Sequence, residues 1–152
     1  MRLSLRHALA ATTLLMLALG VAVANADPPS TNGKLSYTEV IDDTGSLVLS
    51  FDESSQKRFA SVDYQVNATF TEFVTFDTGQ ETGVQGFPNP TVAGLVPSDD
   101  GHVLGNIELA NTNGVPGCTC VVRVEVDYTN LTLTNLSSGH VYRLNDITRI
   151  YP

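Results

Sequence analysis

The sequence carries the tripeptide Asp-Thr-Gly twice, each time after a mainly apolar stretch. The first copy is Asp43-Thr44-Gly45, within VIDDTGS, and the second is Asp77-Thr78-Gly79, after FVTF. Two aspartates held about 3 Å apart share one proton, and such a pair activates water for hydrolysis. The same tripeptide also suits a tight turn, in which Asp supplies a side-chain hydrogen bond and Gly a positive φ. The chemistry and the turn are therefore competing interpretations.

Two hydrophobic residues followed by Asp-Thr-Gly resemble the active-site signature of aspartic peptidases. The resemblance covers only the tripeptides: Ser46 is the favoured small residue after the first Gly, whereas Gln80 departs from the pattern. Asp77 follows Asp43 by only 34 positions. This separation is too short for the β-sheet lobe that has to support each catalytic loop. A dimeric enzyme needs one loop per chain, but no flap hairpin and apolar-Gly loop follow in the required order. We therefore expect two turns, with an aspartic-type hydrolase using Asp43 or Asp77 as the alternative.

The two cysteines are separated by a single residue, in PGCTCVV. In an extended strand Cys118 and Cys120 point the same way, with Cα atoms about 6.5 to 7 Å apart, at the limit of disulfide geometry. A bridge needs a local kink, which the preceding Pro116 and Gly117 permit. Secretion favours oxidation, so we expect this short bridge. Buried thiols, an intermolecular disulfide and a metal or redox site are the alternatives.

Metal ligands are sparse in the rest of the chain. His102 and His140 are the only histidines after the first 26 residues, and zinc sites usually need closer ligand pairs than these and a wider cysteine spacing. Asp99 and Asp100 are weak calcium candidates, because oxygen ligands on loops suit that ion. Asp-Asp-Gly is more often a turn, so we expect no metal and no cofactor. A Gly-x-Ser-x-Gly nucleophile motif is also missing from the sequence.

The first 26 residues have the pattern of a secretory signal peptide. Arg2 and Arg6 precede an apolar run, and Ala24-Asn25-Ala26 is a small-x-small cleavage site. A membrane anchor is the alternative, because the run is only slightly shorter than the roughly 18 residues of a spanning helix. The helix-hostile segment Asp27-Pro28-Pro29 follows at once. We therefore expect cleavage between Ala26 and Asp27, release outside the cell and no membrane insertion afterwards.

Cleavage would leave 126 residues, with six basic and sixteen acidic side chains and a formal net charge of −10. A chain of this length forms one domain that buries roughly two-thirds of its unfolded surface. Its charge repels phosphate backbones and anionic lipid, so nucleic acid is not an expected partner. We expect a disordered segment at 27–33 followed by a single, monomeric domain at 34–152.

Most of this domain alternates apolar and polar residues, the pattern of half-buried strands. We expect strands at 34–41, 46–52, 62–76, 102–109, 118–129, 130–135 and 140–145. The third of them changes parity at Phe73, which predicts a β-bulge or a strand that crosses between sheets. In 118–129 the even-numbered residues form the expected buried face.

Turn signals at intervals of roughly 8 to 12 residues predict an all-β, antiparallel two-sheet sandwich of immunoglobulin-like type, with a small β-barrel as the alternative. Residues 86–101, with three prolines and three glycines, and residues 110–117 are expected loops. Because long loops often carry function, we predict a secreted, non-enzymatic protein that binds an extracellular ligand or protein through them. The alternatives are the hydrolase and an extracellular structural protein cross-linked through Cys118 or Cys120.

Overall fold

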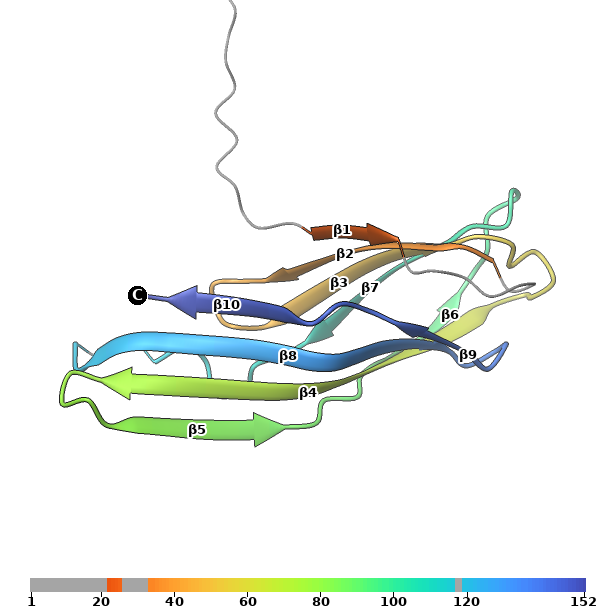
Figure 1. Cartoon of the computed structure of the whole chain (residues 1–152). Helices are drawn as coiled ribbons and strands as arrows, with labels where there is room; N and C mark the ends of the chain where they lie inside the picture. The colour runs from red at the N-terminus through yellow and green to blue at the C-terminus, as the bar shows by residue number, and fades with distance from the viewer. Residues whose placement is uncertain (1–21, 26–32, 117–118) are drawn as a thin grey trace, which may run out of the picture.

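Two antiparallel sheets make up the computed structural model, which describes residues 22–25, 33–116 and 119–152 (Figure 1). Sheet A has the strand order β1-β2-β3-β7, and sheet B has the order β10-β8-β4-β5, with β6 also pairing with β4 and β9 with β8. No helix occurs in the described part of the chain. The sheets are not closed into a barrel. The prediction of an all-β chain with two antiparallel sheets is therefore confirmed.

The strands of the two sheets differ in length. Sheet A contains β1 (Ala22–Asn25), β2 (Leu35–Ile41), β3 (Leu47–Glu53) and β7 (Val103–Leu109). Sheet B contains β4 (Val62–Phe76), β5 (Glu81–Gly86), β6 (Thr91–Leu95), β8 (Val121–Asn135), β9 (His140–Arg143) and β10 (Ile147–Tyr151). The two 15-residue strands β4 and β8 pair at the centre. The edge of β4 is shared by β5 and β6, and that of β8 by β9 and β10.

The core lies between the inward faces of the two sheets. The alternation of β2, β3 and β4 places every second side chain in this core, as expected for strands with one solvated face. Phe51 of β3 and Tyr64 of β4 meet across the sheets with ring centroids 4.6 Å apart. Such burial of large apolar side chains is the main stabilising contribution to the fold.

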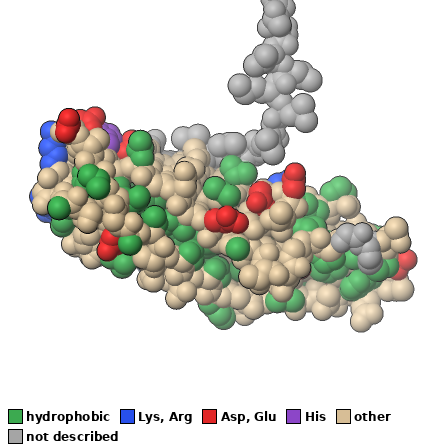
Figure 2. All heavy atoms as spheres, turned by 180° about the vertical axis from the view of Figure 1, so that it is seen from behind, with side chains coloured by type: hydrophobic (Ala, Val, Ile, Leu, Met, Phe, Trp, Pro, Cys, Tyr) green, Lys and Arg blue, Asp and Glu red, His purple; other side chains and the backbone are tan. Residues whose placement is uncertain are grey.

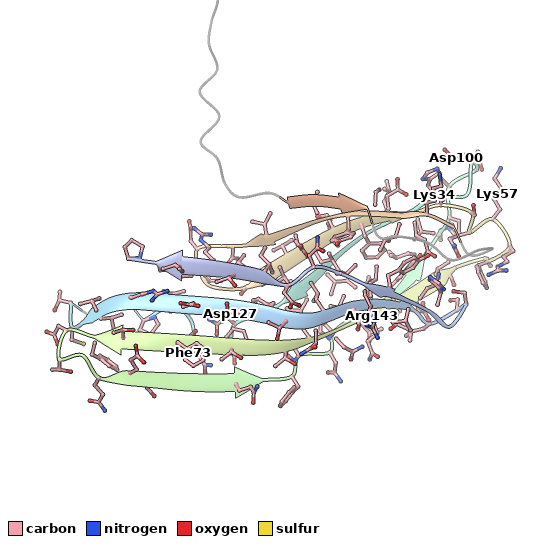
Figure 3. All side chains as sticks on the ribbon, in the orientation of Figure 1. Lys34, Lys57, Phe73, Asp100, Asp127 and Arg143 are labelled. Atoms are coloured by element: carbon pink, nitrogen blue, oxygen red, sulfur yellow. The ribbon has the colours of Figure 1, made fainter. Side chains whose placement is uncertain are left out.

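The predicted change of parity at Phe73 is wrong. β4 keeps one parity through Glu72, which is buried, and Val74, whereas Phe73 is 48% exposed. The ring of Phe73 lies over Gly83 of β5, so closely that a Cβ on Gly83 would come within 3.1 Å of it. Figure 3 labels Phe73 on β4 beside β5. An aromatic ring covering an edge glycine explains the exposed phenylalanine.

The two strands predicted at 118–129 and 130–135 are one strand, β8, with a bulge at Asn130. Asn130 has a φ of 52°, and β4 pairs Thr69 with Thr129 but Asn67 with Thr132, so β8 holds one extra residue there. The bulge reverses the parity of β8, which lets side chains on both sides of it face the core. The expected buried face begins only at Val124, because Cys120 and Val122 are exposed.

The predicted loop at 86–101 is not irregular throughout. Its middle forms β6, which pairs antiparallel with β4. The predicted segment at 27–33 lies outside the described residues except for Gly33. In the described part of the chain no helix is long and apolar enough to cross a membrane.

Candidate functional site

The two loops singled out in the sequence meet at one cleft beside β5. Its volume is about 380 Å³, and it is lined by Phe70, Val84, Gln85, Gly86, Phe87, Pro88, Ala110, Thr112 and Asn113. Phe70 is buried in the core, whereas Phe87 is 73% exposed and Val84 is 45% exposed. We call this hollow the loop cleft. It combines an exposed aromatic ring with amide and hydroxyl groups, and no charged side chain lines it.

Asn111 fixes one wall of the loop cleft to both sheets. Its backbone N–H donates to Ser46 Oγ (3.0 Å), and its Nδ2 donates to Glu72 Oε2 (2.8 Å) and to the Thr44 carbonyl (3.3 Å). The backbone N–H of Asn113 in turn donates to Asn111 Oδ1 (3.0 Å). These bonds run to the β2–β3 turn of sheet A and to β4 of sheet B. The wall is thus held in place before any ligand arrives.

The first Asp-Thr-Gly forms the β2–β3 turn, and Asp42 organises it. Asp42 Oδ1 accepts hydrogen bonds from Thr44 N (2.8 Å), Thr44 Oγ1 (2.6 Å) and Ser46 N (3.0 Å). Burial alone would raise the pKa of Asp42, but these bonds and the Arg149 guanidinium hold it below its ordinary value. Asp43 projects into solvent and pairs with Arg149 Nη2 (2.6 Å). The turn prediction is confirmed here.

The second Asp-Thr-Gly forms the β4–β5 turn. Phe76 N donates to the Gln80 carbonyl (2.9 Å) and Gly79 N to the Phe76 carbonyl (2.9 Å), while Gly79 takes a φ of 79°. Asp77 is exposed, and its backbone N–H donates to the Cys120 carbonyl (2.9 Å). The two turns belong to different sheets. Among the described residues no hydrogen bond or ion pair joins Asp43 to Asp77.

Of the remaining predicted sites, Cys120 lies beside the β4–β5 turn, and Asp99 and Asp100 lie far from it. Cys118 is outside the described residues, so its bridge to Cys120 stays a prediction. Asp99 and Asp100 lie in an exposed turn closed by a bond from Gly101 N to the Ser98 carbonyl (2.8 Å). Figure 3 places Asp100 at the end opposite the β4–β5 turn. No group of three metal-ligating side chains occurs in the part of the chain that the structure describes.

A buried carboxyl group that the sequence reasoning missed lies at the end of β3. Four donors converge on Glu53, which is fully buried. They are Tyr64 Oη (2.6 Å), Asn135 Nδ2 (2.8 Å), Gln56 Nε2 (3.0 Å) and Tyr142 Oη. Burial and then Glu53 itself raise the pKa values of both tyrosines well above the ordinary value, so both hydroxyls stay donors. This Glu53 cluster joins β3 to β4, β8 and β9.

Glu39 of β2 is a second missed carboxyl group, and it lacks such partners. It is only 1% exposed, and its Oε2 atom has no hydrogen-bond partner. Burial, with a smaller contribution from Asp146, raises the pKa of Glu39 to about 7. Its charge state therefore changes close to neutral pH.

Comparison with known proteins gives no family for this chain. No family model matches it, and no curated protein is significantly similar to it in sequence.

Proposed function

We propose that this chain is a secreted, non-enzymatic and monomeric β-sandwich of immunoglobulin-like type that recognises an extracellular protein through the loop cleft. The proposal includes removal of residues 1–26 as a signal peptide. Convergence of residues 86–88 and 110–113 on one hollow is the observation that carries it. Both segments come from the loops that the sequence indicates as functional.

The lining of the loop cleft favours a protein ligand. Exposed aromatic side chains dominate the binding energy of protein interfaces, because they fill pockets on the partner. Phe87 and Val84 offer such apolar surface, and Thr112 and Asn113 at the opposite wall offer polar partners. Acidic side chains are scattered rather than gathered into one patch on the face that Figure 2 shows. A hydrophobic anchor bordered by polar contacts is thus the expected mode of recognition.

The alternatives draw no comparable support. Asp43 and Asp77 lie in separate turns, so nothing among the described contacts favours the aspartic-type hydrolase. Cys118 lies outside the described residues, so the described contacts add nothing to cross-linking between chains. We therefore propose no second function.

The experiment that tests this proposal selects 12-residue peptides from a displayed random library with residues 27–152 as bait. We expect selected peptides to carry an apolar anchor and to lose about tenfold or more in affinity on Phe87→Ala, the range of an interface hot spot. Val96→Ala is the matched control, because Val96 lies beyond β6, is as exposed as Phe87 and does not line the cleft. Failure to enrich any peptide, or equal effects of the two variants, would contradict the proposal.

A further inference from the structure

β5 is an edge strand without the usual protection against pairing. Among the described strands it pairs only with β4, and no strand lies beyond it in Figure 1. Its sequence, ETGVQG, contains no lysine and no proline, and its register with β4 is regular. Its residues are exposed from Glu81 to Gln85. Natural edge strands usually carry lysine, proline or a bulge, because unpaired N–H and C=O groups invite another strand.

Most other edges among the described strands are short, irregular or partly covered. β1 is itself an edge of sheet A, and its removal with residues 1–26 would free residues 36–39 of β2. β10 has 5 residues, and its Arg149 donates to the Ile41 carbonyl at the end of β2. β6 packs over β7, where Leu95 lies within 2.9 Å of the position that a Cβ on Gly105 would take. β6 itself has an irregular register with β4, and β9 has only 4 residues. β5 is thus the edge strand of regular register that borders the loop cleft.

The register of the β4–β5 hairpin shows which backbone groups of β5 are available. Phe76 N bonds the Gln80 carbonyl, and hydrogen-bonded pairs recur at every second position of an antiparallel ladder. Residues 82, 84 and 86 therefore bond β4, and the backbone groups of Glu81, Gly83 and Gln85 point away from it. On the inward side of β5, Val84 and Gly86 line the loop cleft.

We propose that the protein partner contributes an extended segment that adds to β5 as an antiparallel strand and places alternate apolar side chains in the loop cleft. This inference rests on the proposed function and names the form of its ligand. Side chains directly opposite each other in adjacent strands lie on the same face. The partner residues opposite Gly86 and Val84 therefore face the cleft, beside Phe87.

Charge at the start of β5 fixes a third position of the partner segment. Glu81 is exposed and forms none of the ion pairs among the described residues. Lys34 and Lys57 lie at the end of the molecule opposite the β4–β5 turn (Figure 3). A basic residue opposite Glu81 complements it. We number the partner from p, the residue opposite Gly86. Because the partner runs antiparallel to β5, p+2 lies opposite Val84 and p+5 lies opposite Glu81. The expected sequence is therefore apolar at p and p+2, with Lys or Arg at p+5.

The test measures binding of a synthetic peptide to residues 27–152 by fluorescence anisotropy. The probe is a capped nine-residue peptide with Phe at p, Val at p+2, Arg at p+5 and Thr elsewhere. Gln85→Pro removes an outward N–H of β5 and leaves the bonds to β4 intact, whereas Gln85→Ala removes only the side chain. We expect Gln85→Pro to weaken binding about tenfold and Gln85→Ala about twofold or less.

Modified peptides keep the test independent of how the variants fold. N-methylation at p+1 blocks the N–H that faces the Gln85 carbonyl, whereas N-methylation at p+2 blocks an N–H that points away. We expect only the first to reduce binding, and we expect slowed amide exchange at Glu81, Gly83 and Gln85 on binding. Equal effects of the two methylations, or no binding of the probe, would overturn strand addition.

The same measurements separate the inference from the proposed function. Binding that is lost on Phe87→Ala but unchanged by Gln85→Pro and by p+1 methylation supports the loop cleft and overturns strand addition. Binding that survives Phe87→Ala but is lost on Gln85→Pro supports strand addition and overturns the cleft as the source of affinity.

Discussion

The three glutamates buried in the core differ in how many hydrogen-bond donors each of them meets. Glu53 receives four, Glu72 receives one from Asn111, and one oxygen of Glu39 receives none. A buried carboxyl group is costly unless its oxygens are bonded. Glu53 is therefore expected to stabilise the folded state, and Glu39 to oppose it when ionised.

Replacing Glu53 by Gln should destabilise the fold more than removing one of its donors. The amide offers one acceptor and a new NH₂ group to four donors, so two buried donors lose their acceptor at about 1 to 3 kcal/mol each. We expect Glu53→Gln to lower the free energy of unfolding by about 4 kcal/mol, and Tyr142→Phe by about 2 kcal/mol. Urea denaturation measures both. A smaller effect of Glu53→Gln than of Tyr142→Phe would show that the carboxylate is not the centre of the cluster.

Glu39 should make stability depend on pH below neutrality. Its pKa in the folded chain, about 7, lies above its ordinary value of 4.5, so the folded state binds the proton more tightly. Ionisation of Glu39 therefore lowers the free energy of unfolding. This effect is absent below about pH 4.5, grows up to about pH 7 and is then constant at about 3 kcal/mol. Glu39→Gln should therefore gain stability over the parent at pH 8 and little at pH 4.5. Urea denaturation at both pH values checks this, and parallel pH profiles would disprove it.

The two neighbouring aspartates of the first turn should differ in their effect on stability. Asp42→Ala removes three hydrogen bonds within the turn, and we expect a loss of about 1 to 2 kcal/mol. Asp43→Ala removes only the exposed pair with Arg149, which is worth about 0.5 kcal/mol or less. Thermal unfolding of both variants tests this order, and the reverse order would refute the assignment of the turn to Asp42.

At the scale of elements, strict alternation predicted strands well and failed where an inward residue is polar. β2, β3 and β7 begin and end within one residue of the predicted 34–41, 46–52 and 102–109. The side chain of Glu72 faces the core. Because a charged residue is expected to face solvent, the sequence assigns the next inward-facing side chain of the strand to Phe73. Glu39 and Glu53 are in phase with the apolar residues of their strands, so the same alternation was the signal that could have revealed them.

The bulge in β8 and the loop cleft were beyond prediction for a different reason. Asn130 needs a positive φ only because β4 imposes the register of its neighbours, and the register is a property of both strands. The loops at 86–101 and 110–117 were predicted, but their meeting depends on Asn111 reaching Glu72 across the sheets. Contacts between distant segments leave no local pattern in the sequence.

Asn130 should tolerate Gly but not a β-branched residue. Its φ of 52° lies in the left-handed region, which costs an ordinary L-residue about 1 to 2 kcal/mol and Gly almost nothing. We expect Asn130→Val to lower the free energy of unfolding by at least about 1 kcal/mol, and Asn130→Gly to change it by less than about 0.5 kcal/mol. Chemical denaturation of the pair measures this difference. Equal losses would mean that the side chain of Asn130, and not its backbone, supports the bulge.

At the scale of the whole molecule, the buried side chains that the structure describes lie outside the segment predicted to be removed. β1 lies within the first 26 residues and pairs only with residues 36–39 at the outer edge of sheet A. Every buried hydrophobic side chain that the structure describes lies at Leu35 or later. Cleavage after Ala26 would detach β1, unpair that stretch of β2 and keep all of these side chains.

Secretion of the full chain from a host that processes signal peptides tests cleavage, bridging and oligomeric state in one measurement. We expect the released protein to begin at Asp27, to be a monomer under non-reducing conditions, and to weigh two hydrogen atoms less than the reduced chain, because Cys118 and Cys120 are its only cysteines. Reduction should restore the two hydrogens in the parent and change nothing in a monomeric Cys120→Ser control. A non-reducing dimer would indicate cross-linking between chains, and an uncleaved mass would place β1 in the working protein.

In the cleaved protein, amide exchange along β2 should be faster at Ser36–Glu39 than in a chain that retains residues 22–25, because the backbone groups that pair with β1 then face water.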